Sequence, residues 1–427
     1  MVYFSGKLLL KCFLMTYLTR IIDSELTAQL GSVGAVVLEG PKACGKTETA
    51  RQHAESEVLL DIDTHAQAAV DVDPSLILQG ATPRLIDEWQ IMPKIWNHIR
   101  REIDDRATLG QFILTGSAVP SDDVTRHSGA GRLTRIRMRP MSLFETGHAN
   151  GEISVAALLN QASVRSTDPG ITVQQLSERI AVGGWPGNLD LSIEQQTRAV
   201  RSYLAEIQRV DVGRVDQTHR NPQKVGQLLK SLARNVATTT ATATLSRDTS
   251  GAETPINEET TSSYLNALER LMVIEDQPAW SPNLRSRARL RLASKRHFVD
   301  PSLAVAALRA TPSRLLEDLN LFGFLFESLV VRDFRIYAQA SDAMVYHYRD
   351  SNDLEVDIVI EAADGRWAAF EVKLGQGKVD SAAANLNKLT EHIDTSNMTT
   401  LGVIVSNGLG YVRKDGIAVI PIGALGP

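Results

Sequence analysis

The stretch VGAVVLEGPKACGKTETARQHA, residues 33–54, decides the fold of the first part of the chain. Its opening, GAVVLEG, is a continuous apolar run, which is typical of a strand buried on both faces of a parallel sheet. GPKACGKT follows and matches the pattern G-x-x-x-x-G-K-[ST], and TETARQHAESE then predicts a helix. A buried strand, a glycine-rich loop and a helix in this order predict an α/β domain that binds phosphate.

The residue types in the loop suggest how phosphates are held. Gly40 and Gly45 allow the backbone to curl so that its N–H groups point at phosphate oxygens, and the start of the helix adds partial positive charge. Lys46 is expected to reach the outer phosphates, and the Thr47 hydroxyl is expected to ligate Mg²⁺. The alternative is a chance glycine-rich turn. The predicted nucleotide-binding residues of the loop are Gly40, Pro41, Lys42, Ala43, Cys44, Gly45, Lys46 and Thr47.

Two later strands carry polar residues at their ends. In RLIDEWQ, Asp87 is positioned to hold Mg²⁺ and Glu88 to polarise the attacking water, although two acids would also suit the cap of the next helix. QFILTGS predicts another buried strand, and the hydroxyls of Thr115 and Ser117 are expected to face the γ-phosphate. The first domain therefore has a candidate nucleotide site and a candidate catalytic acid.

An arginine-rich segment follows these strands. Five arginines and no acids lie between Arg126 and Arg139. Arg132, after a Gly-Ala-Gly segment, is a candidate arginine finger that stabilises charge in the transition state. A basic strand face explains it equally well, and Arg135, Arg137 and Arg139 alternate with apolar residues as one solvated side of a strand would. If Arg132 acts on a neighbouring copy, the working form is an oligomer.

Composition limits the other possibilities. At 427 residues, with 43% hydrophobic and 22% charged residues, the chain is expected to form two or three globular domains. The net charge of -5 excludes a protein that is basic throughout, and two cysteines are too few for a disulfide framework, so we expect a cytoplasmic protein. The apolar start MVYFSGKLLLKCFLM is interrupted by lysines and too short to span a membrane. We expect no membrane association and a folded chain that begins near Met15.

These motifs resemble a known family. GPKACGKT, LIDEWQ, LTGS and GAGRLTRIRMRPMSLFE occur in the order and spacing of a prokaryotic AAA-type ATPase family. AVGGWPG and SYLAEIQRVDV look like the opening motifs of that family's C-terminal domain of unknown function, so the resemblance covers nearly the whole chain. It implies ATP, Mg²⁺ and a downstream winged-helix and nuclease-like half. The family usually has Arg-Asp in direct succession, whereas Val210 separates Arg209 from Asp211 here, so we assign those two residues no role.

The middle of the chain predicts helices. Residues 148–172 are small and polar, as a linker or surface excursion would be. From Pro222 onward, three short helices followed by a hairpin are predicted, which is the plan of a winged-helix module whose third helix lies in the major groove of DNA. The third helix, NEETTSSYLNALER, carries more acids than bases, and acidic faces repel phosphates. Packing against the ATPase domain or a protein partner is therefore an equal alternative.

A basic run is the better candidate for phosphate contact. In NLRSRARLRLASKRH, residues 283–297, four arginines alternate with other residues, and Lys295 and Arg296 follow. On a strand these arginines would share one face and grip a nucleic-acid backbone without reading its sequence. The alternative is a solvated basic loop. The candidate nucleic-acid contacts are Arg285, Arg287, Arg289 and Arg291.

A second candidate site lies near the C-terminus. EVDIVIEAADGRWAAFEVK, residues 355–373, predicts two strands joined by a tight turn, so that Asp357 lies almost opposite Glu371 and Lys373 shares the face of Glu371. Upstream, LNLFGFLFESLVVRDFRIYA is an apolar helix that buries one acid, Glu327, whose charge needs a cation or a metal. These four residues resemble the restriction-endonuclease-like superfamily, which implies a nuclease site with a second divalent metal. The alternative is a satisfied ion pair on a hairpin.

The predicted architecture is α/β, with three parts. An AAA-type P-loop domain with a parallel sheet covers residues 15–147, a helical and winged-helix-like region covers 173–310, and a restriction-endonuclease-like domain covers 315–427. One function is an ATPase whose Mg–ATP binding and hydrolysis control a half that binds nucleic acid or a partner. The alternatives are an ATP-dependent endonuclease that cuts through Asp357, Glu371 and Lys373, and a non-hydrolysing, nucleotide-dependent DNA-binding regulator.

Overall fold

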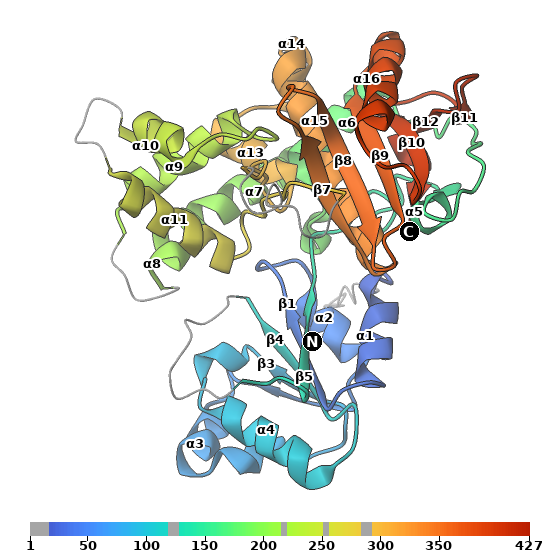
Figure 1. The fold of residues 1–427 in the computed structure, drawn as a ribbon. Helices are drawn as coiled ribbons and strands as arrows, with labels where there is room; N and C mark the ends of the chain where they lie inside the picture. Colours follow the sequence, from blue (N-terminus) through green and yellow to red (C-terminus); the bar gives the residue numbers. More distant parts are fainter. Residues whose placement is uncertain (1–16, 118–127, 215–219, 251–255, 283–292) are drawn as a thin grey trace, which may run out of the picture.

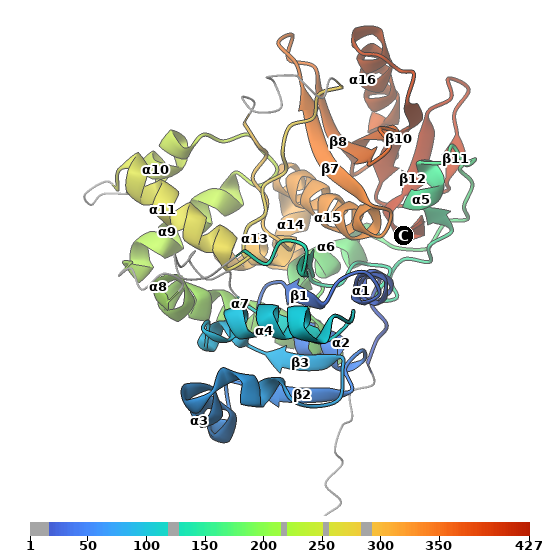
Figure 2. The same ribbon diagram turned by 60° about the horizontal axis from the view of Figure 1, so that its bottom comes forward.

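A computed structural model describes residues 17–117, 128–214, 220–250, 256–282 and 293–427. The N-terminal α/β unit forms the lower part of the molecule in Figure 1, and the helical region and the C-terminal sheet lie side by side above it. The turned view in Figure 2 shows the same separation.

The N-terminal sheet has five strands, and every pairing in it is parallel. The strand order is β2-β3-β4-β1-β5, which places β1 in the interior between β4 and β5. Because β1 and β4 are buried on both faces, their sequences are continuous apolar runs. The predicted parallel P-loop sheet is confirmed. Its strands are β1 (Ala35–Glu39), β2 (Ser56–Leu59), β3 (Arg84–Asp87), β4 (Phe112–Gly116) and β5 (Leu133–Arg137).

In the described part of this domain, four helices accompany the sheet. On α1 the buried residues are Ile22 and Leu26, which pack against β1 and β5 side chains. On α4 the buried residues form one apolar stripe. This stripe packs in a second hydrophobic cluster of the sheet, separate from the one that contains α1. The helices are α1 (Ile22–Leu30), α2 (Lys46–Arg51), α3 (Thr64–Val72) and α4 (Ile95–Arg106).

Residues 148–172 are not the polar linker that the composition suggested. They contain β6 (Ile153–Ser154) and α5 (Val155–Leu158), and β6 pairs in parallel with β13 (Leu425–Gly426) at the far end of the chain. Val155 and Leu158 are buried in the large core that also contains the C-terminal sheet. The linker prediction was wrong because small apolar residues among polar ones give only a weak hydrophobic pattern in the sequence. Such residues nevertheless pack well where two elements lie close together.

The middle of the chain is helical. Three consecutive helices, α9 to α11, are followed by an antiparallel pair in which Ile274 faces Phe298 and Gln277 faces Lys295. This order is the one expected of a winged-helix module, and that assignment stays a prediction. The helices are α6 (Val173–Val182), α7 (Ile193–Glu206), α8 (Val212–Arg214), α9 (Pro222–Arg234), α10 (Thr242–Ser250), α11 (Glu258–Arg270), α13 (Pro301–Leu308) and α14 (Pro312–Glu317).

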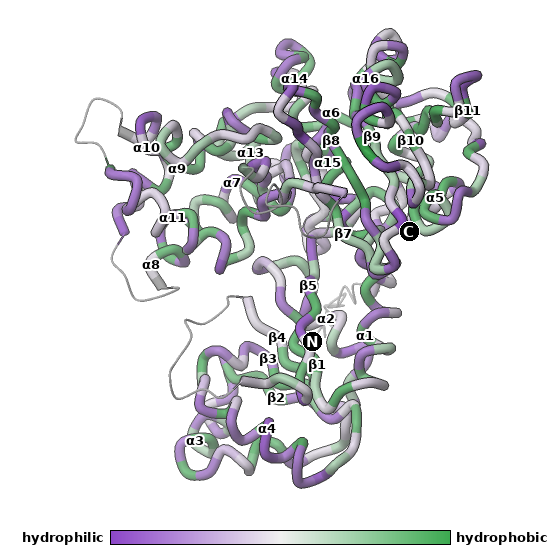
Figure 3. Tube along the Cα trace, viewed as in Figure 1, coloured by the Kyte–Doolittle hydropathy of each residue, from purple (hydrophilic) through white to green (hydrophobic). Residues whose placement is uncertain are grey.

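The C-terminal part is a mixed sheet of six strands in the order β11-β12-β10-β9-β8-β7. Figure 3 shows hydrophobic residues along β8, which lies inside this sheet. The long helix α15 (Leu319–Gln339) packs on one face and α16 (Val379–His392) on the other. The strands are β7 (Ala343–Arg349), β8 (Glu355–Ala362), β9 (Trp367–Lys373), β10 (Met398–Val405), β11 (Tyr411–Val412) and β12 (Ala418–Pro421).

One hydrophobic core continues from the helical region into this sheet, so the two regions pack as one body. None of the helices in the described ranges combines the length and the apolar character needed to cross a membrane.

Candidate functional site

The phosphate loop joins β1 to α2, and two of its positions require glycine. A Cβ at Gly40 would lie 2.3 Å from the Met138 carbonyl oxygen, so no larger residue fits there. Gly45 has a φ of 103°, a left-handed conformation that side chains disfavour. The loop therefore has the local shape that the sequence pattern predicted.

Lys46 lies inside this loop. Its ammonium donates hydrogen bonds to the carbonyl oxygens of Gly40 and Pro41, each at 2.9 Å. The side chain is buried, so the positive charge is concentrated at the loop. This is the place where an ammonium group would meet the outer phosphates of a nucleotide.

Asp87, at the end of β3, lies next to the loop. Its Oδ1 atom accepts a hydrogen bond from the Thr47 hydroxyl at 3.0 Å and another from the Thr115 hydroxyl. A hydroxyl and a carboxylate from two elements thus converge, and both are ligands that Mg²⁺ prefers. These residues fit a Mg²⁺ ion whose other ligands would be phosphate and water oxygens.

Glu88 has an unusual backbone conformation, with a φ of 52°. Its carboxylate accepts hydrogen bonds from the Ser117 hydroxyl at 3.1 Å and from the Gln90 amide. A strained, hydrogen-bonded acid beside a phosphate loop is suited to orient a water molecule. Thr115 and Ser117, expected to face a γ-phosphate, bond Asp87 and Glu88 instead, and their contact with phosphate stays a prediction.

The loop forms one wall of a cleft of about 1320 Å³, and residues far away in the sequence form the other walls. Trp185 and Tyr203 stack with ring centroids 4.7 Å apart, and Pro186 lies near Gly45. Within the described ranges, the Tyr203 hydroxyl is buried without a hydrogen-bond partner. Aromatic walls and one unsatisfied hydroxyl opposite a phosphate loop fit a nucleoside.

Sequence reasoning missed these wall residues. The GGWPG segment sets the backbone shape at this point, because the Gly184 carbonyl oxygen accepts a hydrogen bond from the Met141 amide at 2.7 Å. The same turn also places Trp185, Pro186 and Gly187 in the cleft. No local signal could have revealed this, because the contact is between distant parts of the chain.

Arg132 lies far from the phosphate loop of its own chain. It precedes β5 beside Ala35, at the start of β1, whereas the loop follows the end of β1. The five residues of β1 separate Arg132 from the phosphate loop, a distance of about 16 Å. Its guanidinium forms an ion pair with Asp104 at 2.7 Å. An arginine-finger role stays a prediction and would require a second copy of the chain.

The other arginines of this segment are not one solvated face. Arg139 is paired with Glu275 at 2.6 Å, and Arg137 and Arg335 also lie within 4 Å of the same carboxylate. Although burial acts to raise it, these arginines hold the pKa of Glu275 well below its ordinary value. Glu275 therefore connects the end of β5 to α15 of the C-terminal half.

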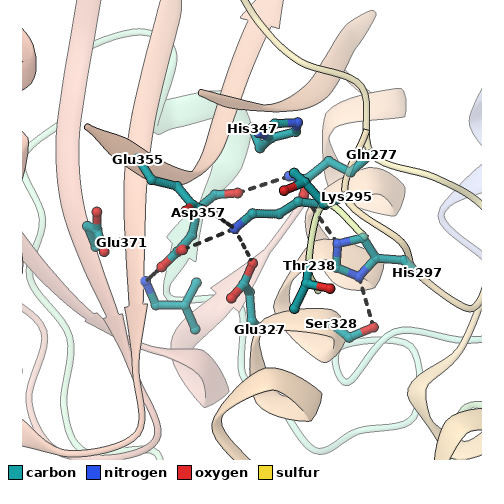
Figure 4. A network of polar contacts seen from close by, with 12 residues as sticks. Thr238, Gln277, Lys295, His297, Glu327, Ser328, His347, Glu355, Asp357 and Glu371 are labelled. Atoms are coloured by element: carbon teal, nitrogen blue, oxygen red, sulfur yellow. Dashed lines mark hydrogen bonds and ion pairs between the residues drawn. The ribbon is translucent and has the colours of Figure 1, made fainter. Parts of the chain in front are cut away.

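The C-terminal hairpin brings its predicted residues together, as Figure 4 shows for Asp357, Glu371 and Glu327. The Lys373 ammonium lies 2.6 Å from Glu371 and 3.2 Å from Asp357. Asn385 donates a further hydrogen bond to Glu371 at 2.6 Å. We call Glu327, Glu355, Asp357, Glu371, Lys295 and Lys373 the acidic centre.

Lys295 occupies the middle of this centre, which the sequence did not predict. Its ammonium lies 2.8 Å from both Glu327 and Glu355 and 3.3 Å from Asp357 (Figure 4). The side chain is only 2% exposed, so Lys295 is not part of a surface basic run. Arg296 is likewise paired, with Asp276. Burial opposes the charged form, but the carboxylates raise the pKa of Lys295 above its ordinary value.

The acids of the centre differ in protonation. Burial, together with the charge of Asp357, raises the pKa of Glu327 to about 8 and that of Glu371 to about 7. Burial also acts to raise the pKa of Asp357, but Lys295 and Lys373 lower it to about 2. In the described ranges, no three His, Cys, Asp or Glu side chains are grouped so that they could hold a metal ion. A second divalent metal stays a prediction.

The four arginines of the predicted basic run lie outside the described residues: Arg285, Arg287, Arg289 and Arg291. Glu327 is not the one buried acid of α15, because Asp333 is also buried and pairs with Arg332 at 2.6 Å. Arg332 in turn contacts the buried Asp300 at 2.8 Å. This second network ties α15 to α13.

Three families match the chain. Residues 32–147 match a family described as an AAA domain. Residues 173–314 match a domain of unknown function (DUF8612), and residues 322–425 match another domain of unknown function (DUF4143). The chain contains an AAA domain. The phosphate loop, Asp87 and Glu88 belong to this AAA domain, and all of the acidic centre except Lys295 lies in the last matched region.

The chain also has similar solved structures. A Walker-type ATPase of Pyrococcus abyssi has 12% identity and a TM-score of 0.42, over 68% of this chain and 96% of that one. A DNA replication initiation factor has 14% identity and a TM-score of 0.22, over 58% and 86%. A signal transduction ATPase with a tetratricopeptide repeat sensor from Pyrococcus horikoshii has 13% identity and a TM-score of 0.22, over 76% and 48%. Similarity at this level carries no functional argument. Comparison with curated proteins finds no match.

Proposed function

We propose that the chain binds Mg–ATP in the cleft, hydrolyses it, and uses nucleotide turnover to control its C-terminal half. The observation that carries this proposal is the composition of the cleft, whose walls come both from the phosphate loop and from the helical region. A nucleotide held there would contact both halves, so its arrival and departure would change how they pack. Two cysteines in the whole chain support a cytoplasmic setting.

Each residue of the AAA domain has a distinct task in this proposal. The Lys46 ammonium binds the outer phosphates, and the Thr47 hydroxyl and the Asp87 carboxylate hold Mg²⁺. Bound Mg²⁺ would neutralise charge on the phosphates. Glu88, fixed by the Ser117 hydroxyl, orients the attacking water. What the C-terminal half acts on, DNA or a protein partner, is open in this proposal.

Two variants test it. Lys46→Ala should weaken Mg–ATP binding at least about 100-fold in calorimetry, because a charged contact is lost. Glu88→Gln should retain binding while phosphate release falls about 100-fold to 10,000-fold, as for loss of a general base. Lys94→Ala, which removes an exposed lysine of the same domain, is the matched control and should change neither. A wild-type chain that binds no nucleotide would contradict the proposal.

The same assay separates hydrolysis from pure binding. Slow turnover that is unchanged in Glu88→Gln would favour the non-hydrolysing regulator. Turnover should be measured with and without DNA, because stimulation by DNA would identify the partner of the C-terminal half.

Metal-dependent cutting at the acidic centre is a second candidate function. The convergence of Glu327, Asp357, Glu371 and Lys373 favours it. The position of Lys295 among these acids opposes it, as does the lack of a three-ligand metal group in the described ranges. Incubation of plasmid DNA with Mg²⁺ or Mn²⁺ tests both the cutting activity and the effect of Lys295. Cutting by the wild type that is lost in Asp357→Ala supports a nuclease. Cutting by Lys295→Met but not by the wild type indicates that Lys295 blocks the site, and no cutting by either of these two chains rejects this function.

A further inference from the structure

An ion pair joins the phosphate loop to the helical region across the cleft. The Lys42 ammonium lies 2.6 Å from Oδ1 of Asp211, and both residues line the cleft. The Lys42 side chain is half-exposed, whereas that of Asp211 is only 11% exposed. Lys42 can therefore move, while Asp211 is held in place by its surroundings.

The backbone around Asp211 is built to present its carboxylate. A π-helical turn, Ile207–Asp211, interrupts the helix after α7 and accommodates one residue more than an α-helical turn would. This wider turn changes the faces on which the following residues lie. Arg209 pairs with Glu206 at the surface, whereas Asp211 faces the cleft.

The other side of the turn is anchored to the three-helix region. Arg220 is buried, and it donates a hydrogen bond to the carbonyl oxygen of Val212, the residue after Asp211, at 2.9 Å. The same guanidinium donates to the Ser263 hydroxyl on α11 at 3.2 Å and lies over the ring of Tyr264. A displacement of Asp211 would therefore reach α11 through two consecutive contacts.

We propose that Asp211 competes with the nucleotide phosphates for Lys42, so that phosphate binding releases the π turn and signals to α11. The inference rests on the proposed function, because it requires a nucleotide in the cleft. A single carboxylate attracts Lys42 before binding. Several phosphate charges in the same loop attract it more strongly after binding, and the pair then opens. Asp211 is thus a positioning residue that converts occupancy of the loop into a change in the helical region.

A double-mutant cycle tests the competition. Asp211→Asn should bind Mg–ATP about fivefold more tightly than the wild type, because Lys42 no longer has a competing partner. In a Lys42→Met background the same change should have little effect. Equal gains in both backgrounds would mean that Asp211 acts only by repelling phosphate at a distance, which would overturn the proposal. Glu206→Gln, with the same change of charge on the solvent side of α7, is the matched control.

Hydrogen exchange gives a readout that does not require nucleotide. Amides of residues 207–214 should exchange faster in both Asp211→Asn and Lys42→Met than in the wild type, and Mg–ATP should produce the same increase in the wild type. Because Lys42 lies exposed on a loop, Lys42→Met should fold even if Asp211→Asn does not. Nucleotide binding without any change in this segment would overturn the inference and leave the proposed function intact. A wild type that binds no nucleotide would overturn both.

Discussion

The Lys295 ammonium contacts three carboxylates although its side chain is only 2% exposed. A buried charge is tolerated when partners of opposite charge surround it, and its loss leaves those partners uncompensated. Lys295 and the carboxylates around it therefore stabilise the fold, whether or not they have a catalytic role. These contacts also explain why Lys295, which comes from the helical region, is buried against the C-terminal sheet.

Removal of this charge should be costly. Lys295→Met keeps a side chain of similar length, but Asp357, whose pKa Lys295 helps to lower, loses a cation, so the free energy of unfolding should fall by about 3–5 kcal/mol. Urea denaturation followed by circular dichroism measures this difference. Lys388→Met, at an exposed position of α16, is the control and should change stability little. A small effect at Lys295 would mean that Asp357 does not depend on this lysine for its charge.

The raised pKa of Glu327 makes stability depend on pH. The folded chain holds the proton to about pH 8, whereas the unfolded chain releases it near 4.5, so this group stabilises the fold at low pH and the contribution is lost as pH rises from about 4.5 to 8. The loss amounts to at most about 1.4 kcal/mol per pH unit. Unfolding free energies at pH 5, 6, 7 and 8 should fall less steeply in Glu327→Gln than in the wild type. Parallel slopes would contradict the raised pKa.

At the scale of elements, the short segment with β6 and α5 contacts both the last strand of the chain and the C-terminal sheet. Its β6 pairs with β13, and the carbonyl oxygens of Leu158 and Leu159 accept hydrogen bonds from Thr400 and Arg366. Elements of two and four residues have little stability alone. They persist because their apolar side chains are buried in the shared core.

Truncation of one of these side chains tests that account. Leu158→Ala should lower the free energy of unfolding by about 2–5 kcal/mol, because it leaves a cavity in the core. Ser163→Ala, at an exposed position of the same segment, should have little effect. Thermal denaturation of both variants measures the difference. Equal stability of the two would restore the interpretation of residues 148–172 as a linker.

At the scale of the whole molecule, the AAA domain and the C-terminal half meet at a cluster of charges as well as at the cleft. Glu275 forms ion pairs with Arg137 and Arg139 at the end of β5 and with Arg335 on α15. Three cations around one buried carboxylate repel one another when that carboxylate is removed. The cluster therefore holds the halves together only while Glu275 is ionised.

Neutralisation of Glu275 should loosen the contact between the halves. Glu275→Gln is expected to lower the free energy of unfolding by about 3–5 kcal/mol, since the arginines lose their counter-charge. In scanning calorimetry the AAA domain and the C-terminal half should then unfold in more clearly separate transitions than in the wild type. Glu194→Gln, which removes an exposed ion pair, should leave the profile unchanged. An unchanged profile in Glu275→Gln as well would show that the apolar contacts alone couple the halves.

The sequence by itself determined the structures that depend on neighbouring residues. The phosphate loop follows from the local spacing of Gly40, Gly45 and Lys46, because backbone shape there depends on each residue in turn. The opposition of Asp357 and Glu371 follows from strand alternation across a short turn, because a hairpin sets its own register.

Only the tertiary structure decided which distant residues meet. Lys295 in the acidic centre, Asp211 opposite Lys42, and Glu275 among the arginines are each brought together across long stretches of chain. The physical reason is that an ion pair leaves no periodic pattern in a sequence, since any lysine is compatible with any carboxylate until packing selects one. Local geometry therefore specified the nucleotide loop, and the burial of charge across the shared core specified how the two halves are joined.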